Sequence, residues 1–135
     1  MQHTKDDLRK YNYLMSEIDG LYHEAAFKAG LSDSVQQILY VVYSENYRCL
    51  QSEIYKQSGV SRQTINSAVR RLEQDGIVRL EKGIGRNTIV YLTDEGIRFA
   101  KEKIEPLYRI EQEIFAEWSL EEMALYLSLI ERYRD

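Results

Sequence analysis

The sequence has one cysteine, one proline and two histidines among its 135 residues. A single cysteine cannot form a disulfide within the chain, and this usage fits the reducing cytosol, so we expect a cytoplasmic protein. No apolar run approaches the roughly 18 residues that a membrane-crossing helix needs, and we recognise no signal peptide at the start. We therefore expect no membrane partner.

Catalytic and metal-binding patterns are also missing. His3 and His23 belong to no Cys/His cluster, so we expect no metal site. No nucleophile–base pair, phosphate-binding loop or catalytic dyad can be recognised. The sequence therefore predicts no enzyme and no cofactor. Cys49 is open to two interpretations, an oxidant sensor or a buried structural thiol, and the second is more common.

The sequence does contain a pair of short helical segments joined by a glycine turn. Residues 52–58 predict a helix, Gly59 a turn, and residues 62–75 an amphipathic helix with apolar residues three or four positions apart. Ser61 suits the N-cap of the second helix and Gly76 its end. The polar face of that helix carries side chains that can reach bases and phosphates: Arg62, Gln63, Asn66, Ser67, Arg70 and Gln74.

Two runs rich in β-branched and aromatic residues follow, at 77–81 and 88–92. Residues 82–87 between them hold two glycines and basic side chains, which predicts a β-hairpin. A helix-turn-helix followed by a basic-tipped hairpin is a winged helix. The alternative is a small structural module whose polar face is ordinary solvated surface.

The charge distribution supports contact with nucleic acid although the formal net charge is −4. Residues 1–47 carry −3 and residues 89–135 carry −5, whereas residues 48–88 carry +4. The positive charge is therefore concentrated in the predicted winged helix, as expected for a surface that meets DNA phosphates.

Amphipathic helices are predicted on both sides of the winged helix. One covers residues 6–29, and another starts after Thr93 and should kink at Pro106, which lacks a backbone N–H. Ser119 and Glu122 form a capping box for a last helix. These helices carry more apolar surface than a winged helix of about 45 residues can cover, so we expect a twofold dimer.

Three motifs resemble the MarR family of bacterial transcription regulators: residues 60–66 (VSRQTIN), 71–79 (RLEQDGIVR) and 89–96 (IVYLTDEG). The resemblance covers nearly the whole chain. It implies a homodimeric, ligand-responsive repressor that binds pseudo-palindromic double-stranded DNA, with intertwined first and last helices. Family wings usually carry Asp two residues before the wing arginine. Here Ile84 precedes Arg86, so we expect that arginine to be held less rigidly.

The predicted fold is thus mainly α with a small β-hairpin wing, in one domain over residues 1–135. Residues 32–92 would form the DNA-binding lobe, and residues 1–30 and 93–135 the dimerisation helices. Tyr22, Tyr40 and Tyr43 could line an effector pocket between the two parts, although aromatic residues at helical spacing are more often core. A winged helix that binds acidic protein partners is the alternative function. The candidate DNA contacts are Arg48, Ser61, Arg62, Gln63, Thr64, Asn66, Ser67, Arg70, Arg71, Lys82, Arg86 and Asn87.

Overall fold

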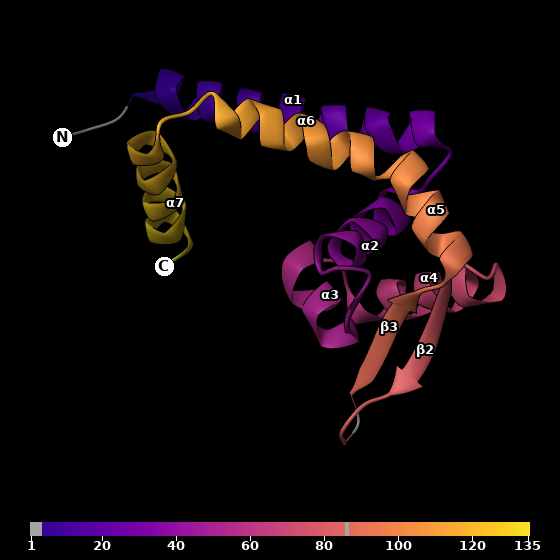
Figure 1. The fold of residues 1–135 in the computed structure, drawn as a ribbon. Coiled ribbons are helices and arrows are strands. Elements are labelled where there is room, and N and C mark those ends of the chain that lie inside the picture. Colours follow the sequence, from indigo (N-terminus) through magenta and orange to yellow (C-terminus); the bar gives the residue numbers. More distant parts are fainter. Residues whose placement is uncertain (1–3, 86) are drawn as a thin grey trace.

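The computed structural model describes residues 4–85 and 87–135. It is mainly helical with one small antiparallel sheet, as the sequence predicts (Figure 1). The helices are α1 (Lys5–Ala29), α2 (Asp33–Ser44), α3 (Gln51–Ser58), α4 (Arg62–Gln74), α5 (Asp94–Lys103), α6 (Glu105–Ala116) and α7 (Leu120–Arg134). The strands are β1 (Arg48–Leu50), β2 (Val78–Lys82) and β3 (Thr88–Leu92).

The helix ends follow local sequence signals. Ser32, Ser61, Thr93 and Ser119 are N-caps whose side-chain oxygens each accept a hydrogen bond from a backbone N–H in the first turn. Thr4 caps α1 in the same way and forms a capping box with Asp7. The caps that the sequence predicts at Ser61, Thr93 and Ser119 are therefore confirmed.

The sheet has one strand that the sequence pattern does not predict. Its order is β1-β3-β2, with β2 and β3 forming the predicted hairpin. Strand β1 adds to the outer edge of β3, where Cys49 lies opposite Val90. Before it, Asn46 and Tyr47 adopt positive φ angles of 61° and 78°, which turn the chain from α2 into β1. The wing is therefore anchored to the start of the helix-turn-helix through β1.

The hydrophobic core lies almost entirely within the winged helix and α5. Ile38, Ile54, Ile65, Val90 and Ile104 are fully buried at its centre. By contrast, α6 and α7 contain no buried residue, and α1 contributes only Ala26. The core therefore makes residues 32–104 one packed unit, and the rest of the chain extends from it.

The predicted kink at Pro106 is a break between two helices. Helix α5 ends at Lys103, Ile104 has φ −111° and ψ −43°, and α6 starts at Glu105 with the proline in its first turn. Because of this change of direction, α5 packs against the winged helix while α6 runs alongside α1 (Figure 1). Helix α7 lies at the far end of the α1–α6 pair.

No helix among residues 4–85 and 87–135 is long and apolar enough to cross a membrane.

Candidate functional site

Helix α4 is fixed to the core by one face. Ile65, Val69 and Leu72 are buried, and they bring α4 against α2 and β2. At its first turn the Thr64 backbone N–H donates to Ser61 Oγ at 3.2 Å, and the Ser61 hydroxyl donates to Thr64 Oγ1 at 2.9 Å. The two hydroxyls that were candidate DNA contacts thus also fix the start of the helix.

The outward face of α4 carries polar side chains that are not held by other described side chains. Gln63, Ser67 and Arg70 are exposed, and none has a hydrogen bond or ion pair to another described residue. Gln63, Ser67 and Arg70 are four and three residues apart, so they share one face of the helix. Arg71, on the adjoining flank, is exposed in the same way. Amide, hydroxyl and guanidinium groups on one helix face are the groups that read base edges in a major groove.

Asn66 differs from this group because α3 holds its side chain. The Nε2 atom of Gln51 donates to Asn66 Oδ1 at 2.6 Å, and the Tyr55 hydroxyl donates to the same oxygen at 2.8 Å. Gln51 Nε2 also lies 2.9 Å from the Tyr55 hydroxyl, and the Arg62 guanidinium stacks over the Tyr55 ring at 5.2 Å. Asn66 therefore lies on the flank of α4 that faces α3, and not at the centre of the outward face.

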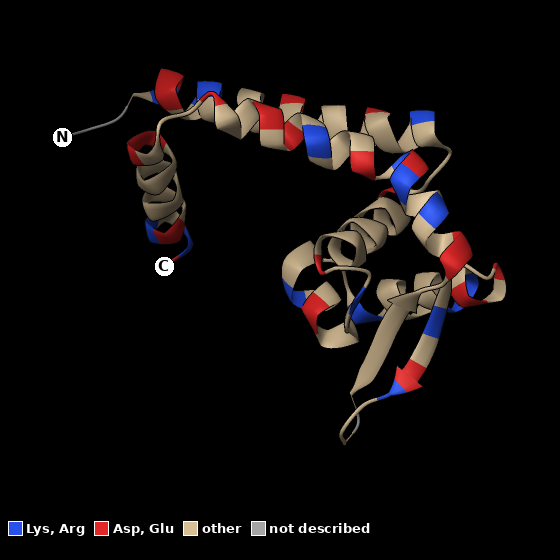
Figure 2. Cartoon of the chain, viewed as in Figure 1, with Lys and Arg blue, Asp and Glu red and all other residues tan. Residues whose placement is uncertain are grey.

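The sheet presents a row of two arginines and a tyrosine. Arg48 of β1 and Arg79 of β2 both lie opposite Tyr91 of the central strand, so the three side chains share one face. The Arg79 guanidinium lies 4.0 Å from the centre of the Tyr91 ring and 3.4 Å from Glu81. Arg48 is exposed and forms no ion pair with another residue that the structure describes. Figure 2 shows Lys and Arg on α3, α4 and β2, around this sheet.

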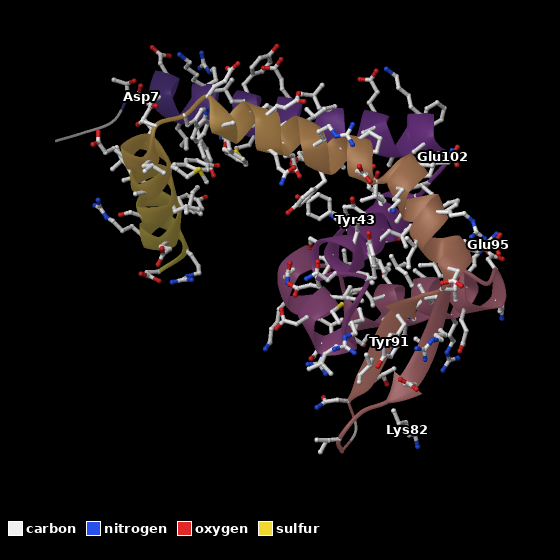
Figure 3. All side chains as sticks on the ribbon, viewed as in Figure 1. Asp7, Tyr43, Lys82, Tyr91, Glu95 and Glu102 are labelled. Atoms are coloured by element: carbon white, nitrogen blue, oxygen red, sulfur yellow. The ribbon has the colours of Figure 1, made fainter. Side chains whose placement is uncertain are left out.

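The wing tip combines cationic, polar and apolar groups. Lys82 extends from the end of β2, away from the helices (Figure 3), and Asn87 is exposed on the opposite side of the turn. The Gly83 N–H donates to the Asn87 carbonyl at 2.7 Å, and Gly85 adopts a φ of 73° that favours glycine. Ile84 is 95% exposed. Arg86, a candidate DNA contact, lies outside the described residues.

Cys49 has the environment of a structural thiol. It lies on the core side of β1 with 9% of its surface exposed. Burial, together with the negative charges of Glu45 and Glu53, raises the pKa of the thiol to about 12. Because the thiolate is the reactive form, this environment disfavours oxidation near neutral pH.

A cavity of about 550 Å³ lies between the winged helix and the α1–α6 pair. Its walls come from α1, α2, the end of α3, and α6. Tyr22 of α1 and Tyr40 of α2 donate hydrogen bonds to the two carboxylate oxygens of Glu111 on α6. Burial is the main cause that raises the pKa of both tyrosines, and the bonds to Glu111 add to it. Both phenols therefore stay protonated, and each donates its hydroxyl proton to the Glu111 carboxylate.

Tyr43, the third candidate pocket residue, is not among the residues that line this cavity. Its ring packs against Tyr47 at 5.9 Å and against Tyr108 at 5.9 Å between ring centres. Burial raises the pKa of Tyr43 to about 12. Figure 3 labels Tyr43 where α2 approaches the later helices. Its contacts are those of a packing residue that joins α2 to α6.

Sequence reasoning missed Gln51, Tyr55 and Glu111. Gln51 and Tyr55 lie four residues apart, so they share one face of α3, but only the packing of α3 beside α4 gives that face its role. Glu111 is 71 and 89 residues from the two tyrosines that bind it. No local signal in the sequence reports either arrangement.

Comparisons with known proteins agree with the fold. Residues 29–85 match the model of the MarR family. A MarR family regulator from Neisseria meningitidis has a TM-score of 0.80 at 16% identity, covering 95% of this chain and 91% of its own. NadR in complex with 4-hydroxyphenylacetate has a TM-score of 0.73 at 18% identity, covering 98% and 94%.

BldR, a transcriptional regulator from Sulfolobus solfataricus, has a TM-score of 0.71 at 24% identity and covers 98% of this chain and 99% of its own. A comparison with curated protein sequences gives no match. The structural matches extend the likeness beyond the family-model segment to the flanking helices. Residues 29–85 of this chain are therefore similar to the MarR family model, and its fold is that of solved MarR family regulators over nearly the full length.

Proposed function

We propose that this protein is a sequence-specific transcriptional regulator that binds double-stranded DNA as a homodimer and releases it in response to a small molecule. The observation that carries the proposal is the outward face of α4. The side chains of Gln63, Ser67 and Arg70 are exposed there without a partner among the described residues, beside exposed cations on the sheet and the wing. A helix of this kind in a winged helix-turn-helix enters the major groove, where its amide and guanidinium groups read base edges.

The cations around α4 supply the nonspecific part of the affinity. Arg48, Lys56, Arg62, Arg71 and Lys82 are exposed within the segment that carries the positive charge. Each phosphate that a cation neutralises adds roughly 0.9 to the slope of log affinity against log salt concentration. Binding should therefore weaken steeply with salt even though the sequence pI is about 5.3.

Dimerisation is supported by the apolar surface outside the core. Among residues 4–85 and 87–135, twenty of the exposed large hydrophobic residues lie in α1, in α6, in α7 or at the α6–α7 junction, and only Leu50 and Ile84 lie elsewhere. A single protomer leaves these faces in water, which is unusual for a stable monomer. A second copy would cover them and would set two α4 helices about 34 Å apart, one helical turn of DNA. Those twenty are Leu8, Tyr11, Tyr13, Leu14, Met15, Ile18, Leu21, Tyr22, Phe27, Ile110, Ile114, Phe115, Trp118, Leu120, Leu125, Tyr126, Leu127, Leu129, Ile130 and Tyr133.

Effector control is supported by the place of α3 in the fold. Its C-terminal residues Gln57 and Ser58 line the cavity, and its earlier residues Gln51 and Tyr55 hold Asn66 on α4. A molecule that occupies the cavity touches the same helix that positions the DNA-reading element. We expect such a molecule to act as an inducer of a repressor, by changing the spacing of the two α4 helices while the dimer stays intact.

Binding to genomic fragments near the gene tests the DNA-binding part of the proposal. Fluorescence anisotropy should give tight, sequence-dependent binding that weakens with salt, and Arg70→Ala should abolish the preference for the cognate fragment. Arg9→Ala is the matched control, because Arg9 is an exposed arginine of α1 that lies outside the winged helix. Equal binding to all fragments, or binding that is insensitive to Arg70→Ala, would reject sequence-specific recognition by α4. Capture of an acidic protein in place of DNA would favour the interaction-module alternative.

A further inference from the structure

We propose that the cavity between the winged helix and the α1–α6 pair binds an organic amine that carries one positive charge, with the Glu111 carboxylate as its counter-charge. The inference deepens the proposed function, because it names the chemical class of the effector. It rests on that proposal only for the link to DNA release. Binding of the amine to the free protein can be measured without any DNA.

The charge of the cavity lining favours a cation. Asp19, Asp33 and Glu111 line the cavity, and none of the described residues that line it is Lys or Arg. Asp33 has a local partner, because its carboxylate oxygens lie 2.9 Å from Nδ1 of His23. Asp19 and Glu111 form no ion pair with a described Lys, Arg or His. An anionic ligand would meet two carboxylates without a balancing charge, whereas a cation would be attracted by both.

The hydrogen-bonding groups at Glu111 also favour a ligand that donates. Tyr22 and Tyr40 each direct their only hydroxyl proton to Glu111. These two phenols are the obvious donors for a ligand carboxylate, but they are already committed. Each Glu111 oxygen accepts one bond from a tyrosine and retains a second lone pair. The free hydrogen-bonding capacity at this point is therefore that of an acceptor, which suits the N–H groups of an ammonium.

The size of the cavity and the chemistry of its walls suit a small organic amine. The volume of about 550 Å³ falls in the usual range for small-molecule sites, roughly 300–1,000 Å³. The rings of Tyr22 and Tyr40 stand beside the carboxylate, and aromatic rings attract cations through their faces. Val41 and Leu107 add apolar wall for the carbon skeleton of a ligand. An amine attached to a small aromatic or aliphatic body matches this combination.

The net charge of the chain segments around the cavity is negative, like the charge of the cavity lining. Residues 1–47 and 89–135, which supply most of the cavity wall, carry net charges of −3 and −5. Clefts that are lined by one sign of charge raise the local concentration of ions of the opposite sign. A cation is therefore favoured at this cavity, unlike the 4-hydroxyphenylacetate anion in the complex of the structural neighbour NadR.

Three probes that share a phenol ring but differ in charge test the proposal by calorimetry on the full chain at pH 7. They are tyramine, which is a cation, 4-ethylphenol, which is neutral, and 4-hydroxyphenylacetate, which is an anion. We expect tyramine to bind at least about tenfold more tightly than the other two, as an ion pair in a partly shielded site allows. Equal or tighter binding of 4-hydroxyphenylacetate, or no measurable binding of tyramine at millimolar concentration, would overturn the proposal.

Glu111→Gln assigns the effect to the carboxylate. Glutamine keeps the size of the side chain and an oxygen that can accept from a tyrosine, so the fold should be retained, and thermal unfolding checks this. Tyramine binding should weaken by at least about tenfold, while binding of 4-ethylphenol should stay within about twofold. Glu113→Gln, an exposed glutamate of α6 that does not line the cavity, is the matched control and should leave both unchanged. Unchanged tyramine binding in the Glu111 variant would refute the counter-charge.

The failure of this inference and that of the proposed function are distinguishable. If tyramine binds the free protein as expected but no genomic fragment is bound, the cavity assignment stands and the regulator proposal fails. If DNA binds with the expected sequence dependence and all three probes fail to bind, the regulator proposal stands and the cavity assignment fails.

Discussion

Asn66 offers the sharpest test of how this protein reads DNA. Its Oδ1 atom accepts hydrogen bonds from Gln51 at 2.6 Å and from Tyr55 at 2.8 Å. A free asparagine can pair with adenine through two bonds, donating to N7 and accepting from N6. With the oxygen occupied, only the Nδ2 donor remains for a base. We therefore predict that Asn66 contacts the N7 atom that both purines share, so wild-type protein accepts adenine or guanine at one position of each half-site.

The size of the effect follows from the bonds involved. Asn66→Ala removes the base contact and leaves two donors on α3 without their acceptor, which should cost about 1–3 kcal/mol on the cognate site. Gln51→Ala combined with Tyr55→Phe keeps Asn66 but frees its oxygen. At that operator position, the base preference of the protein should then shift from either purine towards adenine. The shift should be a substantial part of the roughly 1–3 kcal/mol that a two-bond pair contributes to base discrimination.

Binding of a randomised operator library measures all of these variants. Gln57→Ala is the matched control, because Gln57 is another glutamine of α3 whose amide donates to Glu45 and Glu53 and not to Asn66. Its base preference should equal that of the wild type. Strict adenine preference in the wild type, unchanged when Gln51 and Tyr55 are replaced, would show that α3 does not restrict Asn66.

Three further predictions concern assembly and stability. Sedimentation of the wild-type protein at micromolar concentration should show a dimer. Ile114→Arg, on the exposed face of α6, should shift the equilibrium towards a monomer of about 16 kDa. A wild-type monomer at this concentration would refute the dimer. Cys49 should react with a thiol reagent only when the protein unfolds. The pKa of the Cys49 thiol is about 8.5 in an unfolded chain and is raised to about 12 in the folded protein, so the free energy of unfolding should fall as pH rises between these values. Cys49→Ala should make that fall smaller. Rapid reaction of the native protein with the thiol reagent would contradict both expectations. Gly96→Ala would place a methyl group 1.9 Å from the Ile77 carbonyl oxygen and should destabilise the protein by about 1–3 kcal/mol. Gly20→Ala has open space in α1 and should stabilise the protein by roughly 0.5–1 kcal/mol. Urea denaturation at one protein concentration compares the two variants.

Much of the fold was predictable because its signals are local. Ser61, Gly76 and Thr93 mark helix ends through the hydrogen bonds and backbone angles of their own turns, and the structure confirms each. Pro106 marks the break between α5 and α6 for the same reason, since its missing N–H acts within one turn. Strand β1 was not predictable. Three residues are too few to show a period, and they form a strand only because β3 pairs with them some forty residues later.

The position of Asn66 shows how a pattern can be right about a helix and incomplete about a residue. Helical periodicity correctly separates the buried side of α4 from its polar side. It does not say which part of the polar side meets a neighbouring helix. Gln63 and Arg70 face outward, whereas Asn66 is turned towards α3 and is held there by Gln51 and Tyr55. Whether a polar side chain of α4 is free to contact a base therefore depends on its packing against α3, which helical periodicity does not predict.

The role of Glu111 at the cavity likewise depends on tertiary packing and not on its local sequence. In a continuous helix from Thr93, position 111 falls on the edge of the apolar stripe, where a glutamate would be an ordinary boundary residue. The break at Ile104 gives α6 its own direction, and Glu111 joins Leu107, one turn earlier, at the cavity. Tyr22 and Tyr40 then fix its carboxylate from two other helices. The negative charge of the cavity is thus produced by tertiary packing, and for this reason the ligand class has to be argued from the structure.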